Sequence, residues 1–148
     1  MTSVKDKLEL IGIVAVIVSI LILGYEIRQN TDTSAAQAVF ELNESARQTL
    51  FQEATDPNLA SLISKAEKDL EALSERERYM YGRWVFAHVN LFESAWRYNR
   101  RGVISDAEME GWENAFCGYM ARTSFRQVVK SVEVFTPEFA EESAQWCD

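Results

Sequence analysis

The amino-acid sequence predicts an all-α protein: an N-terminal transmembrane helix that continues into a long helix, packed with a small helical bundle. Three observations support this prediction. Residues 10–25 form an uncharged run rich in Ile, Val and Leu. The chain has only 6 Gly and 2 Pro among 148 residues, a composition typical of helices. Signals for helix starts and stops recur after the uncharged run.

The uncharged run is the candidate membrane anchor. At about 1.5 Å per residue, its 16 residues cover roughly 24 Å, somewhat less than the roughly 30 Å hydrocarbon core of a bilayer. Extension to residues 8–27 gives 20 residues and includes Glu9 and Glu26, which can reach toward the headgroups. We therefore expect an anchor over residues 1–30 and a soluble all-helical domain over residues 31–148.

Two other interpretations of the run are less favoured. A core helix would be unusual for an uncharged and β-branched run of this length. For a cleaved signal peptide, the small-x-small site at residues 36–38 lies too far beyond the run. We expect an uncleaved single span in a bacterial inner membrane. Lys5 and Lys7 before the span, against Arg28 after it, favour an N-terminus on the inside.

Charge and cysteine content narrow the function classes. A formal net charge of −8 argues against nucleic-acid binding, which requires a basic face. Cys117 and Cys147 could form a disulfide in an oxidising compartment or be buried thiols in the cytosol. With one His and no CxxC motif, we expect no metal site and no cofactor.

The segment after the anchor is expected to form one long helix to about Thr55. No Gly or Pro occurs between Gly24 and Pro57, and apolar residues recur at helical spacing. This stripe consists of Ala35, Val39, Leu42, Ala46, Leu50 and Ala54. A break is most expected at residues 31–33, where Thr and Asp side chains compete for backbone hydrogen bonds.

Capping signals divide the rest of the chain. Asp56 before Pro57 predicts a helix from Pro57 to about residue 70. Ser74 and Glu77 fit a capping box for a third helix, which should run to about residue 101 and stop at Gly102.

The later helices are expected to be shorter. Ser105 with Glu108 fits a second capping box, for a helix to about residue 121. A short helix around residues 125–132 should follow. Thr136 and Pro137 predict a last helix, which should end near Trp146.

The third helix carries the candidate soluble site. It has seven aromatic residues between residues 79 and 98, more than one core stripe accommodates. A possible pocket or partner face consists of Trp84, His88, Phe92 and Trp96. The alternative is that large rings simply fill the core, which we favour for Trp84 and Trp96. His88 is expected to be half-buried and hydrogen-bonded, and Glu93 to pair with Arg97 four residues later.

Enzymatic motifs are missing from the sequence. It has no nucleophile–base pair, Gly-rich phosphate loop or HExxH pattern, so we expect no catalytic residues. Several arginines could contact anionic headgroups or pair with the many Glu residues, and ion pairing is the favoured alternative. They are Arg76, Arg78, Arg83, Arg97, Arg100 and Arg101.

Small residues mark one face of the expected span. Gly12, Ala15 and Ser19 lie at spacings of three and four, and Glu26 extends the same face. Such a face allows close approach of a second helix. It could form a homo-oligomeric contact or, less plausibly, a pore with acidic rings. The alternative is that small residues are simply common in spans.

Two motifs resemble an uncharacterised family of bacterial single-span membrane proteins with a QIRQNT-type motif after the N-terminal transmembrane helix. Residues 25–31, YEIRQNT, are similar to the first motif, with Glu26 where the family usually has Gln. The FESAW run at residues 92–96, followed by Tyr98, Gly102, Ile104, Glu108 and Gly111-Trp112, resembles the second. Residues 136–139, TPEF, also look like the family's ending. The resemblance implies a membrane-anchored helical protein without an established activity.

We therefore expect a non-enzymatic, membrane-anchored helical interaction module: an accessory subunit or a self-associating scaffold. Its expected partners are the lipid bilayer and either a second copy or another membrane protein. The alternative is a small-ligand sensor that uses the aromatic third helix. A sensor needs a cavity beside Trp84, His88 and Phe92, whereas an accessory subunit needs an exposed apolar face.

Overall fold

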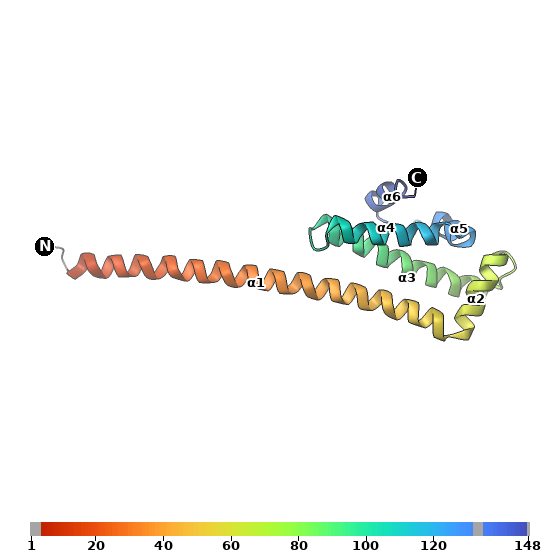
Figure 1. Cartoon of the computed structure of the whole chain (residues 1–148), viewed down its shortest axis with the longest axis horizontal. Helices are drawn as coiled ribbons and strands as arrows, with labels where there is room; N and C mark the ends of the chain where they lie inside the picture. Colours follow the sequence, from red (N-terminus) through yellow and green to blue (C-terminus); the bar gives the residue numbers. More distant parts are fainter. Residues whose placement is uncertain (1–3, 132–134, 148) are drawn as a thin grey trace. The chain divides into compact units, whose positions relative to one another are not determined.

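The computed structural model of the chain, which describes residues 4–131 and 135–147, confirms the all-α prediction. The described residues form six helices and no strand (Figure 1). These are α1 (Val4–Thr55), α2 (Pro57–Lys68), α3 (Glu75–Arg100), α4 (Asp106–Met120), α5 (Thr123–Ser131) and α6 (Pro137–Ser143).

The chain divides into two compact units between Ala38 and Val39. In the described part of the first unit, α1 is the only element. The expected break at residues 31–33 is wrong. The hydroxyls of Thr31 and Thr33 instead donate hydrogen bonds to the carbonyls four residues earlier, at 2.9 Å each, and the helix continues.

Capping side chains define the helix starts in the second unit. Asp56 accepts hydrogen bonds from the amides of Asn58 and Leu59 at the start of α2. The capping boxes of Ser74 with Glu77, and of Ser105 with Glu108, are both present. After α3, the left-handed turn occurs at Gly102, with a φ of 69°. α2 ends slightly earlier than expected, because the Asp69 side chain accepts hydrogen bonds from the amides of Glu71 and Ala72 in the turn that follows.

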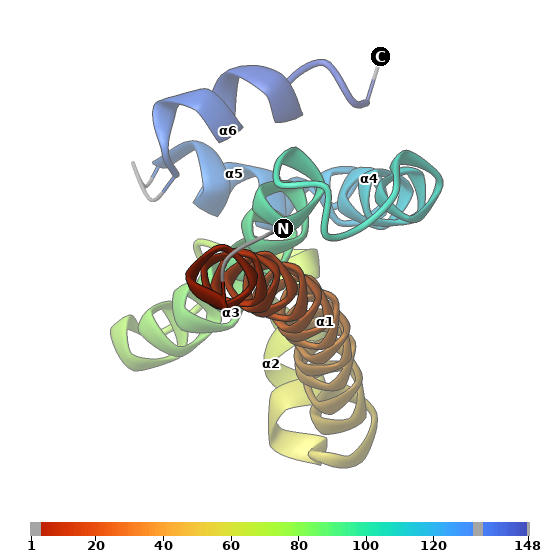
Figure 2. The same cartoon turned by 90° about the vertical axis from the view of Figure 1, so that its left-hand side faces the viewer.

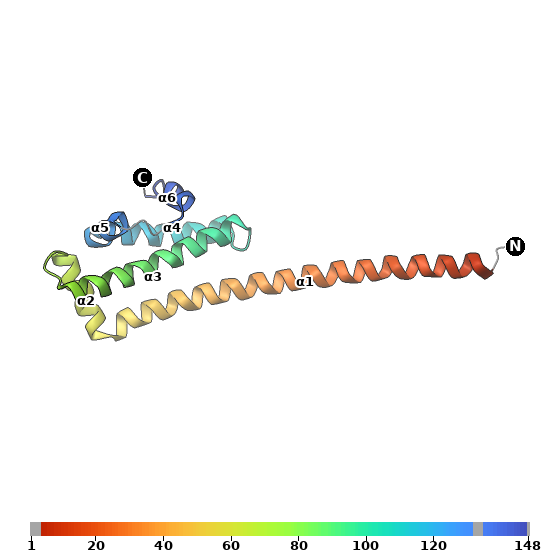
Figure 3. The same cartoon turned by 180° about the vertical axis from the view of Figure 1, so that it is seen from behind.

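Helix α3 is the central element of the second unit. It contacts α2, α4 and α5, and Figures 2 and 3 show it beside α4 and α5. One core cluster includes Tyr81, Trp84 and Phe125, and a second includes Phe92 and Trp96. The buried rings of α3, which are Tyr81, Trp84, Phe92 and Trp96, lie along one helical stripe that supplies both clusters, whereas Tyr79 is exposed.

The part of α1 in the second unit packs with a different stripe from the one expected. Leu42 is buried, and Val39 packs against the same core cluster. Leu50 and Ala54 are exposed, contrary to prediction, and Glu53 takes the inward position. The reason is the polar surface of α3 at this position: the Trp84 indole N–H donates a hydrogen bond to the Glu53 carboxylate, and the His88 imidazole lies beside it.

The C-terminal segment is attached to the domain by three kinds of contact. Phe139 is fully buried, and the Thr136 hydroxyl donates a hydrogen bond of 2.8 Å to Glu93. Cys117 and Cys147 form a disulfide. α6 ends at Ser143, before the expected Trp146, because tight turns after it bring the chain back toward Cys117.

We predict that replacing Cys117 and Cys147 together by Ser destabilises the domain. The disulfide closes a loop of 30 residues, and loss of that constraint on the unfolded chain costs about 3 to 4 kcal/mol. The free energy of unfolding of the full chain in detergent, from urea titration followed by Trp fluorescence, measures the loss. Reduction of the unmodified protein should give the same change. A loss below about 1 kcal/mol would contradict a stabilising disulfide.

Candidate functional site

A buried polar cluster forms where α1, α3 and α4 meet. One carboxylate oxygen of Glu53 (Oε1) lies 2.7 Å from His88 Nε2 and accepts a hydrogen bond of 3.1 Å from Trp84 Nε1. The Tyr119 hydroxyl reaches the same oxygen at 3.5 Å. The His88 side chain is almost fully buried, and that of Glu53 retains only 17% exposure. Three elements are thus joined at a single oxygen atom.

The two ring nitrogens of His88 face oxygen acceptors. Nδ1 lies 2.9 Å from the carbonyl oxygen of Trp84, one turn earlier in α3. Nε2 faces Glu53 at ion-pair distance, although the oxygen lies away from the direction of a well-aligned hydrogen bond. His88 thus contacts the backbone of its own helix through one ring nitrogen and the α1 carboxylate through the other.

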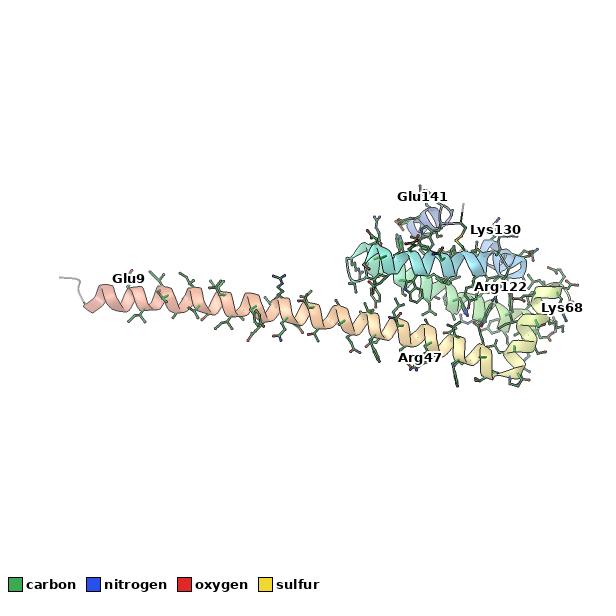
Figure 4. The ribbon with its side chains drawn as sticks, in the orientation of Figure 1. Glu9, Arg47, Lys68, Arg122, Lys130 and Glu141 are labelled. Carbon is green, nitrogen blue, oxygen red and sulfur yellow. A yellow bond between two sulfur atoms is a disulfide. The ribbon has the colours of Figure 1, made fainter. Side chains whose placement is uncertain are left out.

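The surroundings of the cluster shift two pKa values. Burial raises the pKa of Glu53, but the imidazole of His88 and the indole N–H of Trp84 outweigh it, and the net pKa is lowered. Burial, followed by the nearby Glu53 charge, raises the pKa of Tyr119 to about 12. Arg122, labelled in Figure 4, adds a favourable charge and also pairs with Glu67 at 3.2 Å.

An apolar cavity of about 110 Å³ adjoins the cluster. Leu50 of α1, Phe92 of α3 and Trp112 of α4 line it, with His88 and Tyr119 at the side of the polar cluster. A cavity of this volume and lining holds only a small apolar molecule.

The four residues of the expected pocket or partner face are all buried. Trp84 belongs to one core cluster, and Phe92 and Trp96 belong to the other. His88 lies between the two, with its ring 4.4 Å from that of Trp84, and is more deeply buried than expected. Of the four, only His88 and Phe92 line the cavity, so the structure does not bring them together as one surface.

The expected partner of Glu93 is present. Arg97 Nη2 lies 2.6 Å from the Glu93 carboxylate, and Thr136 donates to the same oxygen. Because the Glu93 carboxylate is satisfied from both sides, its buried charge has a structural explanation.

Other arginines of the expected cluster also bind Glu residues: Arg78 pairs with Glu71, and Arg100 with Glu142. The part of the chain that the structure describes holds no group of three residues that could ligate a metal ion.

The expected contact face of the span lies in the first unit. Gly12, Ala15, Ser19 and Glu26 are exposed, and a Cβ added to Gly12 would meet no atom within 4 Å. The Ser19 hydroxyl donates a hydrogen bond of 2.8 Å to the carbonyl of Ala15, so it is satisfied within the helix. This face is therefore compatible with an apolar environment.

Glu53 is the site residue that sequence reasoning missed. It lies 35 residues before His88, and no local motif joins the two. A signal was present: steps of four, three and four from Leu42 lead through Ala46 and Thr49 to Glu53, which places it on the buried face of α1. The more apolar Leu50 and Ala54 obscured that spacing.

Comparisons of the sequence with protein-family models and with curated proteins, and of the fold with solved structures, found no match.

We predict that Glu53→Gln lowers stability by about 2 kcal/mol near pH 6, because it removes the charged acceptor that the buried Trp84 indole and His88 imidazole face. The folded-state pKa of Glu53 is lowered, so its stabilising contribution is present above its unfolded pKa and is lost as the pH falls through the folded value. The difference in unfolding free energy between the two proteins should therefore shrink between pH 6 and pH 3.

The matched control is Glu141→Gln, at an exposed carboxylate labelled in Figure 4. It should leave the unfolding free energy within about 0.5 kcal/mol of the unmodified protein. A Glu53→Gln difference that stays constant with pH would show that the charge of Glu53 does not stabilise the fold.

Proposed function

We propose that this protein is a non-enzymatic helical interaction module anchored in a membrane by the first part of α1. The observation that carries the proposal is the uncharged run at residues 10–25. Its described side chains are exposed rather than packed against the protein. Leu21 is 68% exposed and Ile11 is 64% exposed. Among the described residues, one helix is long and apolar enough to cross a bilayer. An apolar surface this continuous is rare on soluble monomers and fits contact with lipid.

The disulfide supports an orientation for the anchored protein. Disulfides persist in oxidising compartments and are rare in the cytosol. Cys117 and Cys147 both belong to the second unit, which favours its location on the oxidising side of the membrane. Lys5 and Lys7 before the run favour an N-terminus on the cytoplasmic side, which gives the same orientation. In a bacterial inner membrane, the domain would then face the periplasm.

An interaction role suits the polar groups of the domain better than catalysis. The buried groups Glu53, Trp84 and His88 bind one another across α1 and α3, and Glu93 is paired with Arg97 and Thr136. Catalysis requires polar groups that converge on a space for substrate. The exposed face of Gly12, Ala15 and Ser19 instead suits a second transmembrane helix, either of another copy or of a different membrane protein.

A second candidate function is a small-ligand sensor. It is favoured by the apolar cavity of about 110 Å³, lined in part by His88 and Phe92. A ligand there would touch α1, α3 and α4 at once and could change how α1 packs on the domain.

We predict that the full chain resists extraction by alkaline carbonate and is released by detergent. Val16→Lys combined with Ile20→Lys should move the protein to the soluble fraction, because each Lys at the centre of a span costs about 2.5 to 3.5 kcal/mol. The matched control, Val16→Leu with Ile20→Leu, should stay with the membrane. Membrane fractionation with immunoblotting gives the distribution. Full chain in the soluble fraction would refute the anchor.

We further predict that the particle extracted in mild detergent is larger than one chain. A protein mass that is a multiple of 16.9 kDa would identify self-association, and additional polypeptides would identify an accessory subunit. Gly12→Leu or Ser19→Leu should shift the particle toward the monomer, because a larger side chain separates the helices. Val14→Leu, on the opposite face, should not. Light scattering after size exclusion measures the mass, and a bare monomer would argue against an interaction module.

A further inference from the structure

A second, larger hollow lies between α3 and α5, on a different part of the domain from the polar cluster. It is a groove of about 330 Å³. Val85 and Val89 of α3 are its buried floor, and Phe86, Val128 and Phe135 are half-buried walls. α3 and α5 lie side by side in the fold (Figures 2 and 3). A hollow with this apolar lining favours an apolar group as its occupant.

Gly82 keeps one side of the groove open. It lies inside α3, where Gly is less favourable than Ala by about 0.5 to 1 kcal/mol. Neither backbone conformation nor packing requires glycine there. Its φ is not positive, and a Cβ at this position would meet no atom within 4 Å. A side chain at residue 82 would instead extend into the groove, which gives the glycine a role in keeping space available.

Arg83 supplies a positive charge at the edge of the groove. Its guanidinium carbon lies 5.1 Å from the centre of the Phe86 ring, so a cation–π contact holds the side chain against the wall. Arg78 and Arg97 of the same helix pair with Glu residues, whereas Arg83 pairs with no carboxylate among the described residues. The Arg83 side chain is exposed, so an anion in solvent can reach the guanidinium. Tyr79, one turn before Arg83 in α3, is also exposed and lines the groove.

We propose that this groove binds a single-chain anionic amphiphile, with its apolar chain between α3 and α5 and its carboxylate or phosphate at Arg83. The volume lies at the low end of small-molecule sites, which suits one chain rather than two. A free inorganic anion would gain nothing from the apolar floor, and an uncharged hydrocarbon would gain nothing from Arg83. The shared chemistry fits a free fatty acid or one acyl chain of a phospholipid. Binding at this site would be a function separate from membrane anchoring, and it does not depend on the anchor.

The test is photo-crosslinking of the full chain in bilayer discs. The probe is dodecanoate with a diazirine at the end of its chain, and peptide mass spectrometry locates the attachment. We expect attachment in peptides that carry Tyr79, Phe86 or Val128. A second arm uses discs that contain a phospholipid with the same diazirine chain. Attachment from added dodecanoate assigns a free amphiphile, and attachment only from the phospholipid assigns the bilayer as the source. Groove peptides unlabelled in both arms would overturn the proposal.

Two variants separate chain binding from charge recognition. Gly82→Leu should abolish groove labelling, because the new side chain occupies the hollow. Arg83→Gln should weaken competition by unlabelled dodecanoate about tenfold and leave competition by dodecanol unchanged. Gly118→Leu, at an exposed α4 glycine that also has no atom within 4 Å of an added Cβ, is the matched control. Equal labelling of the unmodified, Gly82→Leu and Gly118→Leu proteins would refute the site. The labelling pattern does not depend on the extraction behaviour that tests the anchor.

Discussion

The contact between Glu53 and His88 is the interaction on which the arrangement of the second unit most depends. Their side chains join α1 to α3 at a distance of 2.7 Å between His88 Nε2 and Glu53 Oε1, and both side chains are largely buried. An unpaired charge at such depth is strongly unfavourable, so α1 must present Glu53 to α3 in one rotational setting. The apolar residues of α1 alone would allow several settings, since Phe40, Leu50 and Phe51 are exposed in the one observed. The polar contact thus specifies the rotational setting of α1 against α3. The apolar contacts stabilise the fold without selecting that setting.

A second set of constraints acts at the other end of the domain. Glu93 joins α3 to the segment before α6, and the disulfide joins the segment after α6 to α4. α6 is only 7 residues long and could not maintain its position by intrinsic helix stability. Burial of Phe139 and these two connections hold it in place. The position of α6 therefore depends on side-chain links to α3 and α4.

The all-α fold class and the helix boundaries could be predicted from the sequence, because both are determined by local interactions. The capping boxes at Ser74 and Ser105 and the glycine at residue 102 act over a few residues, and all three occur as expected. The links between helices were harder to predict. Glu93 with Arg97 was predictable at one turn of spacing, whereas Glu53 with His88 is a tertiary contact. The groove could not be predicted, because its residues lie on separate helices and only the packing of α3 against α5 brings them together.

Gly82 places fold stability and ligand access in opposition at one position. Selection or redesign for thermal stability alone would replace a helix-interior glycine early, because most other residues favour the helix and this site offers no steric obstacle. Such a replacement would fill the hollow beside Arg83. Among natural variants of this chain, the residue at this position would then report whether the groove is maintained. A consensus sequence optimised for heat resistance would be a poor guide to what the domain binds.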